Sequence, residues 1–311
     1  MVGFGGWVDA YNLRVQIVTL VKKCPYCCVK IIPRSINVFS ESDFASLLKI
    51  YNEIEWLNRF AEEVEDLWLI LDTVEQKKLV EDLLSNFKYI DGNKVFESLK
   101  ILVNQIENVW ELEPENTFLV ATSDGNRPDG SQVLIQWLKN KFSVGWREKN
   151  FYNSILPAAH TINSNCNIVL VDDFIGTGDT IERRVRYIKE KLVKRSVENV
   201  KLFIISIGSM KISEAKISLT GAEFFSVYLL NKGITETYLG DEKVSAIKNM
   251  ESLESKLRPN IGKRRLPNFG YKSSEALFAI ENCNIPNNVF PIFWWPELIG
   301  GESRKTIFRR V

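Results

Sequence analysis

Residues 168–180 have the sequence IVLVDDFIGTGDT. The first four are aliphatic, which is typical of a strand buried on both faces of a parallel sheet. Two carboxylates, Asp172 and Asp173, follow this run. A loop of small residues, 176–180, then leads into an amphipathic helical pattern that begins at Ile181. The stretch therefore predicts a strand, an acidic pair, a Gly/Thr loop and a helix, in that order.

Each part of this stretch has a chemical use. Backbone N–H groups at the start of a helix have no partner within the helix, and the helix dipole is positive there, so a phosphate fits against the loop. Glycine lets the backbone approach the phosphate, and threonine adds a hydroxyl donor. The two carboxylates can accept hydrogen bonds from neighbouring sugar hydroxyls. Together these groups predict a site for a phosphorylated ribose. The predicted phosphate-binding residues are Gly176, Thr177, Gly178, Asp179 and Thr180.

The same thirteen residues resemble the phosphoribosyl pyrophosphate motif of type I phosphoribosyltransferases: four apolar residues, two acids, two variable positions and a small-residue loop. The resemblance implies that Asp172 and Asp173 contact the 2′- and 3′-hydroxyls of the ribose and that the loop holds its 5′-phosphate. It also implies Mg²⁺ held mainly by oxygens of the substrate, so no side chain is predicted as a metal ligand. The alternative is a Rossmann-like strand, loop and helix with a chance acidic pair, although the stretch contains neither GxGxxG nor a lysine after its last glycine.

The composition is that of an ordinary globular protein. The chain has 311 residues, of which 45% are hydrophobic and 25% charged, and 40 basic against 39 acidic side chains give a net charge of +1. This balance argues against a protein built mainly to grip nucleic acid. No apolar run approaches the length of a membrane span, and the N-terminus has no basic region followed by an apolar core. We therefore expect a cytoplasmic protein without a membrane partner.

A second loop lies one strand–helix unit before the acidic pair. The strand predicted at 117–121 leads into a turn rich in Gly, Ser and Asp, and a helical pattern with Val133 and Leu134 follows. In phosphoribosyltransferases this position holds the pyrophosphate loop, and a single arginine suits a di-anion. Such sequences also occur in ordinary turns. The residues assigned to the loop are Ser123, Asp124, Gly125, Asn126 and Arg127, with Arg127 as a catalytic residue that neutralises the departing pyrophosphate.

Strands alternate with helices along the rest of this region. Apolar runs at 200–207 and 222–230 predict two more strands, and helical patterns at 210–219 and 235–257 follow them. The alternation predicts an α/β fold with a doubly wound parallel sheet and right-handed crossovers, of the phosphoribosyltransferase type. The resemblance places a mobile hood loop in the polar interval 143–165.

The part of the chain before the sheet has a different pattern. Apolar residues repeat at helical spacing from Ser42 to about Trp110, which predicts a region of packed helices. Residues 1–40 mix apolar runs with Gly and Pro and include the motif CPYC, from Cys24 to Cys27. The spacing copies a glutaredoxin-type redox pair, but no helical pattern follows it. We therefore expect free thiols rather than a redox or zinc site.

The tail changes character again. Residues 263–271 are basic and aromatic, and the pair Trp294 and Trp295 lies between prolines, which we interpret as a packed plug over the sheet. Together with DDFIGTG, the segment PNNVFPIFWW resembles a narrower group, the phosphoribosyltransferase-like proteins encoded in bacterial conflict and anti-phage systems. The predicted domains are an N-terminal arm and helical region (1–115), a phosphoribosyltransferase-like α/β core (116–257) and a C-terminal arm that covers the core (258–311).

The expected function is transfer of the phosphoribosyl group from phosphoribosyl pyrophosphate to an unknown acceptor, as an effector in a bacterial anti-phage defence system. Asp172 and Asp173 are the remaining predicted catalytic residues, and one of them relays a proton. The alternative is a catalytically inactive nucleotide or phosphate sensor in a defence complex. Two departures from the family support it: no base-reading hood is identified, and Asp179 adds negative charge to the phosphate loop. Either function implies protein or nucleoprotein partners. A third interpretation is a nucleic-acid-binding arm that uses Lys263 to Arg265.

Overall fold

Five parallel strands form the centre of the protein, for which a computed structural model describes residues 39–125 and 128–311. They lie in the order β3-β2-β4-β5-β6. The strands are β2 (Thr117–Ala121), β3 (Phe151–Tyr152), β4 (Cys166–Ile175), β5 (Val200–Met210) and β6 (Glu223–Leu230). The prediction of a parallel α/β sheet is confirmed. Its physical reason is the near-continuous aliphatic character of β4 and β5, whose residues are buried on both faces.

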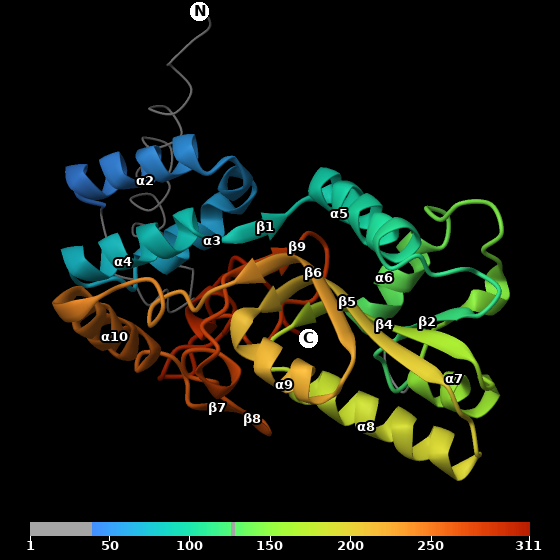
Figure 1. Ribbon diagram of the computed structural model, residues 1–311. Helices are drawn as coiled ribbons and strands as arrows, with labels where there is room; N and C mark the ends of the chain where they lie inside the picture. Colours follow the sequence, from blue (N-terminus) through green and yellow to red (C-terminus); the bar gives the residue numbers. More distant parts are fainter. Residues whose placement is uncertain (1–38, 126–127) are drawn as a thin grey trace, which may run out of the picture. The chain divides into compact units, whose positions relative to one another are not determined.

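Helices cover both faces of this sheet (Figure 1). On one face lie α7 (Ile155–Thr161), α8 (Asp179–Lys194) and α9 (Glu214–Leu219), where Ile168 and Leu170 of β4 share a buried cluster with Val185 of α8. On the other face lie α5 (Gly92–Asn104) and α6 (Gly130–Leu138). Successive residues of a strand point to opposite faces of the sheet. Every second residue of β4 therefore packs against the helices on one face, and the residues between them pack against the helices on the other. The fold is therefore doubly wound, as predicted.

The helical region before the sheet is also confirmed, with one addition. It contains α2 (Glu41–Glu53), η1 (Glu55–Phe60), α3 (Ala61–Trp68), α4 (Val74–Ser85) and the π-helical turn η2 (Gln105–Val109). A short strand that the sequence pattern did not predict, β1 (Lys88–Ile90), lies between α4 and α5. It pairs in parallel with β9 (Phe278–Ile280) of the tail. Residues 44–311 form one compact unit. The β1–β9 ladder joins the helical region of this unit to its C-terminal tail.

The C-terminal arm is held by side chains more than by regular structure. After α10 (Gly240–Glu254) it contains β7 (Asn260–Ile261), β8 (Arg264–Arg265), η5 (Tyr271–Ser273), β9 and η6 (Pro291–Phe293). The ring of Phe278 stacks on Phe174 of β4 at 4.7 Å between centroids, and a Cβ on Gly208 of β5 would lie 2.5 Å from it. Trp294 and Trp295 are buried, which agrees with the interpretation of a packed plug.

Two other parts of the chain complete the fold. The interval 143–165, which was expected to be a loop, contains η3 (Glu148–Asn150), the edge strand β3 and α7, and η4 (Lys211–Ser213) precedes α9. The CPYC motif lies outside the described residues. No helix in the described part of the chain is both long and apolar enough to cross a bilayer.

Candidate active site

A cavity of about 750 Å³ lies where the chain leaves β2 and β4 in opposite directions. The chain continues from β2 into α6 on one face and from β4 into α8 on the other (Figure 1). Such a switch point leaves a crevice at the carboxyl ends of the strands. Its walls are the start of α6, the loop after β4 and the C-terminal arm. All the residues predicted to hold the ribose and its phosphate line this cavity, namely Asp172, Asp173, Gly176, Thr177, Gly178, Asp179 and Thr180.

The acidic pair lies near the end of β4, and both side chains are partly buried. The backbone N–H of Asp173 donates to Oδ1 of Asp172 at 3.0 Å. Burial and then the charge of Asp173 raise the pKa of Asp172 well above its usual range, and burial also raises the pKa of Asp173. Two carboxylates in this position repel each other, and a hydrogen-bond donor placed between them stabilises both. Sugar hydroxyls are donors of that kind.

The start of α6 approaches the acidic pair closely. Asp129 caps this helix, since its carboxylate accepts hydrogen bonds from the backbone N–H and the hydroxyl of Ser131 at 3.1 and 2.6 Å. Gln132 completes a capping box. At Gly130, a Cβ would lie 2.0 Å from a carboxylate oxygen of Asp173, so the close approach requires glycine. Asp129 and Gly130 line the cavity but were not among the predicted site residues, although the spacing Asp-x-x-Gln was a visible signal.

The loop after β4 leads into a helix whose first backbone N–H groups lack carbonyl partners, and the same loop contacts the arm. Gly178 has a φ of 79°, a left-handed value that favours glycine, and α8 begins at the next residue. The first backbone bond of the helix runs from the N–H of Glu182 to the carbonyl of Gly178, at 2.9 Å. The N–H groups between them have no carbonyl partner in the helix, which favours an anion. On the other side, a Cβ on Gly176 would lie 2.2 Å from the side chain of Asn288.

Asp179 forms ion pairs with Lys216 of α9 and with Lys272 of the arm. The Nζ of Lys272 lies 2.6 Å from Oδ2 of Asp179. Hydrogen bonds from Lys216 and then Lys272 hold the pKa of Asp179 well below its usual range. One carboxylate against two ammonium groups leaves a net positive charge beside the phosphate loop. The negative charge that Asp179 brings to this loop is therefore compensated.

The predicted pyrophosphate loop is only partly described, because residues 126–127, which include Arg127, lie outside the described part of the chain. Ser123 is buried, and its hydroxyl accepts a hydrogen bond from the backbone N–H of Gly125 at 3.0 Å. The carboxylate of Asp124 lies 3.4 Å from the guanidinium of Arg184 on α8. These three residues stabilise the turn before α6 and do not line the cavity. Their assignment to pyrophosphate stays a prediction, as does that of Asn126 and Arg127.

The arm builds the third wall of the cavity with Tyr271, the turn after β9 and Arg310. The lining residues of the turn are Glu281, Asn282, Cys283, Asn284, Pro286, Asn287 and Asn288. No residue of the interval 143–165 lines the cavity, because that interval forms the sheet edge at β3 and the helix α7. The expectation of a mobile hood loop in this interval stays a prediction. The C-terminal arm forms part of the cavity wall.

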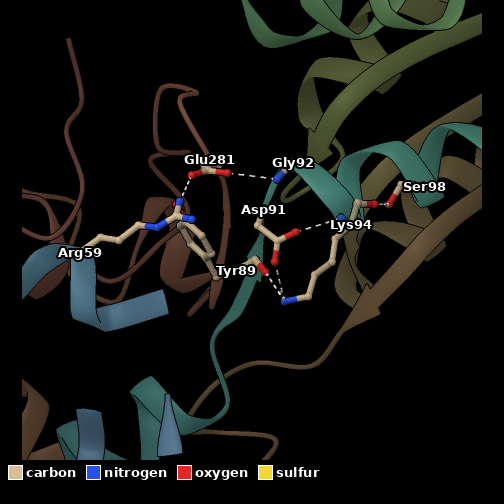
Figure 2. A network of polar contacts seen from close by, with 7 residues as sticks. All are labelled: Arg59, Tyr89, Asp91, Gly92, Lys94, Ser98 and Glu281. Carbon is tan, nitrogen blue, oxygen red and sulfur yellow. Dashed lines mark hydrogen bonds and ion pairs between the residues drawn. The ribbon is translucent and has the colours of Figure 1, made fainter. Parts of the chain in front are cut away.

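A polar network holds the turn after β9 against the helical region, as Figure 2 shows. Glu281 forms an ion pair with Arg59, and its Oε2 accepts a hydrogen bond from the backbone N–H of Gly92 at 3.0 Å. Asp91 caps α5 by accepting from the backbone N–H of Lys94 at 2.9 Å. The pairing of β1 with β9 ends directly beside these residues. The third wall is therefore positioned by the helical region, through contacts that are distant in sequence.

Carboxylates that line the cavity could contact a metal ion bound together with a ligand. The described residues contain no group of three or more His, Cys, Asp or Glu side chains arranged to hold a metal. The acidic pair offers the oxygen ligands that Mg²⁺ prefers, and Mg²⁺ commonly takes its other ligands from water and substrate phosphates. Asp172 and Asp173 would be the residues nearest to such an ion.

The sequence profile of one protein family, PRTase-CE, matches residues 53–310. This match spans most of the chain. The chain belongs to the PRTase-CE family. The name of the family denotes phosphoribosyltransferases, which agrees with the strand order and with the motif at the end of β4. The association with anti-phage defence is a finer statement that family membership does not establish.

Among solved structures, the comparison of this PRTase-CE protein finds phosphoribosyltransferases at low identity and low TM-score. The orotate phosphoribosyltransferase of Aeropyrum pernix is 14% identical, with a TM-score of 0.28, over 43% of this chain and 70% of that chain. The adenine phosphoribosyltransferase of Thermoanaerobacter pseudethanolicus is 17% identical, with a TM-score of 0.29, over 44% and 81%. The xanthine-guanine-hypoxanthine enzyme of Helicobacter pylori is 14% identical, with a TM-score of 0.30, over 46% and 85%. No curated protein matches the sequence significantly.

Proposed function

We propose that this PRTase-CE protein binds phosphoribosyl pyrophosphate together with Mg²⁺ and transfers the phosphoribosyl group to an acceptor. The observation that carries the proposal is the meeting of the acidic pair and the start of α8 in one cavity at the switch point of the sheet. Family membership supports the reaction class. The acceptor is not specified by these residues.

In the proposed complex, Gly176 to Thr180 hold the 5′-phosphate against the start of α8. The helix dipole and the lysines paired with Asp179 favour the negative charge of the phosphate there. Asp172 and Asp173 accept hydrogen bonds from the ribose 2′- and 3′-hydroxyls. Charge-assisted bonds of this type are shorter and stronger than neutral ones. The acidic pair at one end of the β4–α8 loop would thus hold the ribose hydroxyls, and the start of α8 at the other end would hold the 5′-phosphate.

In the transfer step, the bond between ribose C1 and a pyrophosphate oxygen breaks, and its electron pair leaves with the pyrophosphate. A lone pair of the acceptor forms the new bond to C1, and the acceptor gives up one proton. Asp172 suits the proton acceptor, because burial and Asp173 raise its pKa. The carboxylates also stabilise the positive charge that develops on the sugar. Mg²⁺ bound to the substrate would neutralise part of the pyrophosphate charge, and Arg127 is assigned to the remainder.

The finer assignments belong to the same proposal. The protein would act as a cytoplasmic effector of a bacterial anti-phage system with protein or nucleoprotein partners, for which the resemblance of the tail is the support. The parts 1–115, 116–257 and 258–311 would be its domains, although the β1–β9 ladder links the first to the last. The inactive sensor is argued from the charge of Asp179 and from the lack of an identified base-reading hood. The two lysines that pair with Asp179 weaken the first of these arguments.

Calorimetric titration with phosphoribosyl pyrophosphate, with and without Mg²⁺, tests binding. A pyrophosphate-release assay with fractionated cell extract as the source of acceptor then tests transfer. We expect binding that strengthens with Mg²⁺ and release in proportion to an extract fraction. Binding without release in any fraction would favour the sensor, and the absence of binding would contradict the proposed ligand.

A further inference from the structure

The cavity contains a guanidinium that the predicted motif does not account for. Arg310 of the arm lines the cavity with a partly buried side chain. Its Nη1 donates to the backbone carbonyl of Ile285, and its Cζ lies 5.9 Å from the centre of the Trp294 ring. These contacts leave most of the five N–H donors of the guanidinium for another partner.

Arg310 has no carboxylate partner in the described part of the chain; its side-chain contacts there are a carbonyl and an aromatic ring. This distinguishes it from Lys216 and Lys272, which are both paired with Asp179. Burial and the nearby charge of Arg264 lower the pKa of Arg310, and the charge of Asp173 opposes this shift. An arginine stays protonated near neutral pH even so. A partly buried cation that has no carboxylate in direct contact favours an anionic ligand.

The surroundings of Arg310 indicate which anion this is. Arg310 and Asp173 line the same cavity and their charges attract each other, and the Asp173 carboxylate lies against Gly130, at the start of α6. The phosphate loop lies at the start of α8 instead, next to Lys216 and Lys272. Suppose that the 5′-phosphate of a ligand occupies the loop and that its ribose contacts the acidic pair. The second anionic group, which is attached to C1, then lies on the side of the sugar away from the phosphate loop.

We propose that Arg310 binds the pyrophosphate group of phosphoribosyl pyrophosphate, so that the C-terminal arm completes the site begun by the β4–α8 unit. This inference rests on the proposed function. The guanidinium is a planar fork that matches phosphate oxygens in pairs. Its backbone is held in place, because Arg264 donates to the carbonyl of Arg310 at 3.2 Å and the N–H of Val311 donates to Asn284 at 3.0 Å.

The test compares three ligands, each with Mg²⁺: phosphoribosyl pyrophosphate, inorganic pyrophosphate and ribose 5-phosphate. Arg310→Ala should weaken the first two by about tenfold or more, because charge-assisted hydrogen bonds to a phosphate are lost. The affinity for ribose 5-phosphate should change by less than about twofold, since that ligand lacks the second anionic group. Arg309→Ala is the matched control: its side chain is exposed, it removes the same charge, and it should leave all three affinities unchanged.

Arg310→Gln keeps a long side chain that can still donate to the carbonyl of Ile285, so it separates the lost charge from a disturbed arm. Thermal melting of each variant shows whether the arm is intact. An equal loss of affinity for phosphoribosyl pyrophosphate and ribose 5-phosphate would show that Arg310 does not act on the pyrophosphate group, and it would overturn the inference. Unchanged binding of all three ligands by both Arg310 variants would also overturn it, and the proposed function would stand. If the unsubstituted protein does not bind phosphoribosyl pyrophosphate, the proposed function itself fails.

Discussion

The sheet and the C-terminal arm meet at one cavity but are built in different ways. The sheet contributes a ten-residue strand, β4, and the loop that follows it, all continuous in sequence. The arm has strands and helical turns of only two or three residues. Its side chains are nevertheless among the most deeply buried in the described chain, with Phe290 and Phe293 0% and Trp295 1% exposed.

The difference shows where each region obtains its stability. Backbone ladders and a near-continuous apolar run in β4 and β5 define the sheet. The arm gains stability mainly by burying large side chains against the sheet and the helical region, because short strands contribute few hydrogen bonds. Positions in the arm therefore depend on distant neighbours, and its contribution to the site depends on the whole unit being folded.

The largest effect is expected in the arm. Trp295→Ala removes a buried indole from a tightly packed cluster and should lower the free energy of unfolding by about 3–5 kcal/mol. Urea titration followed by circular dichroism measures this change. Ile299→Ala in the same arm is the control, since Ile299 is 64% exposed and should change stability by less than about 0.5 kcal/mol. Similar small effects for both variants would show that the arm is not held by its buried side chains.

The acidic pair should show the reverse pattern, with a large effect on binding and a small one on stability. Asp172→Asn with Asp173→Asn keeps side-chain volume and removes two repelling charges, so the melting temperature should stay constant or rise. Each lost charge-assisted bond to a ribose hydroxyl weakens binding by roughly 1.5–3 kcal/mol, so affinity for phosphoribosyl pyrophosphate should fall at least about tenfold. A collapse in melting temperature with unchanged affinity would mean that the pair is structural.

Gly176 lies at the junction of the two regions and should affect both properties. In Gly176→Ala the new methyl group would meet the buried side chain of Asn288, whose amide donates to Ser274 at 3.1 Å. Overpacking of this type costs about 1–3 kcal/mol and should shift the arm away from the phosphate loop. Thermal melting and ligand titration measure the two effects. Gly300→Ala, at a glycine with no atom within 4 Å of the new Cβ, should change neither.

A pH dependence is expected where α10 meets the arm. The buried carboxylate of Glu254 accepts hydrogen bonds from the backbone N–H of Phe269 at 3.0 and 3.1 Å, and burial raises its pKa to about 8. Between the ordinary carboxyl pKa and this value, the folded state binds more protons than the unfolded state. Stability should therefore fall as pH rises through this window and then level off above about pH 8.

Melting curves between pH 5 and pH 9 measure this effect, for which we expect a loss of about 5 °C or more that Glu254→Gln reduces. The part of the slope that comes from the raised pKa values of Asp172 and Asp173 should remain. Glu190→Gln, at an exposed glutamate of α8, should retain the slope of the unsubstituted protein. A slope that Glu254→Gln leaves unchanged would assign the pH dependence to other groups.

The sequence by itself determined the sheet and the half of the site that belongs to it. The run before Asp172 and Asp173 predicts a strand buried on both faces, and the small-residue loop before Ile181 predicts the start of a helix. These are local properties, because strand and helix periodicity and backbone conformation depend on residues that are adjacent in the chain. The loop and the acidic pair consequently line one cavity, as their order along the chain required.

Only the tertiary structure decided the other half of the site. Lys216 and Lys272 compensate Asp179, Asn288 lies against Gly176, and Arg310 reaches the cavity from the arm. A three-residue strand such as β1 or β9 is too short for its period to be recognised. The position of a side chain in the arm is set by burial against surfaces that other parts of the chain supply. Contacts of this kind have no signature in a local pattern, because they exist only once residues distant in sequence have packed together.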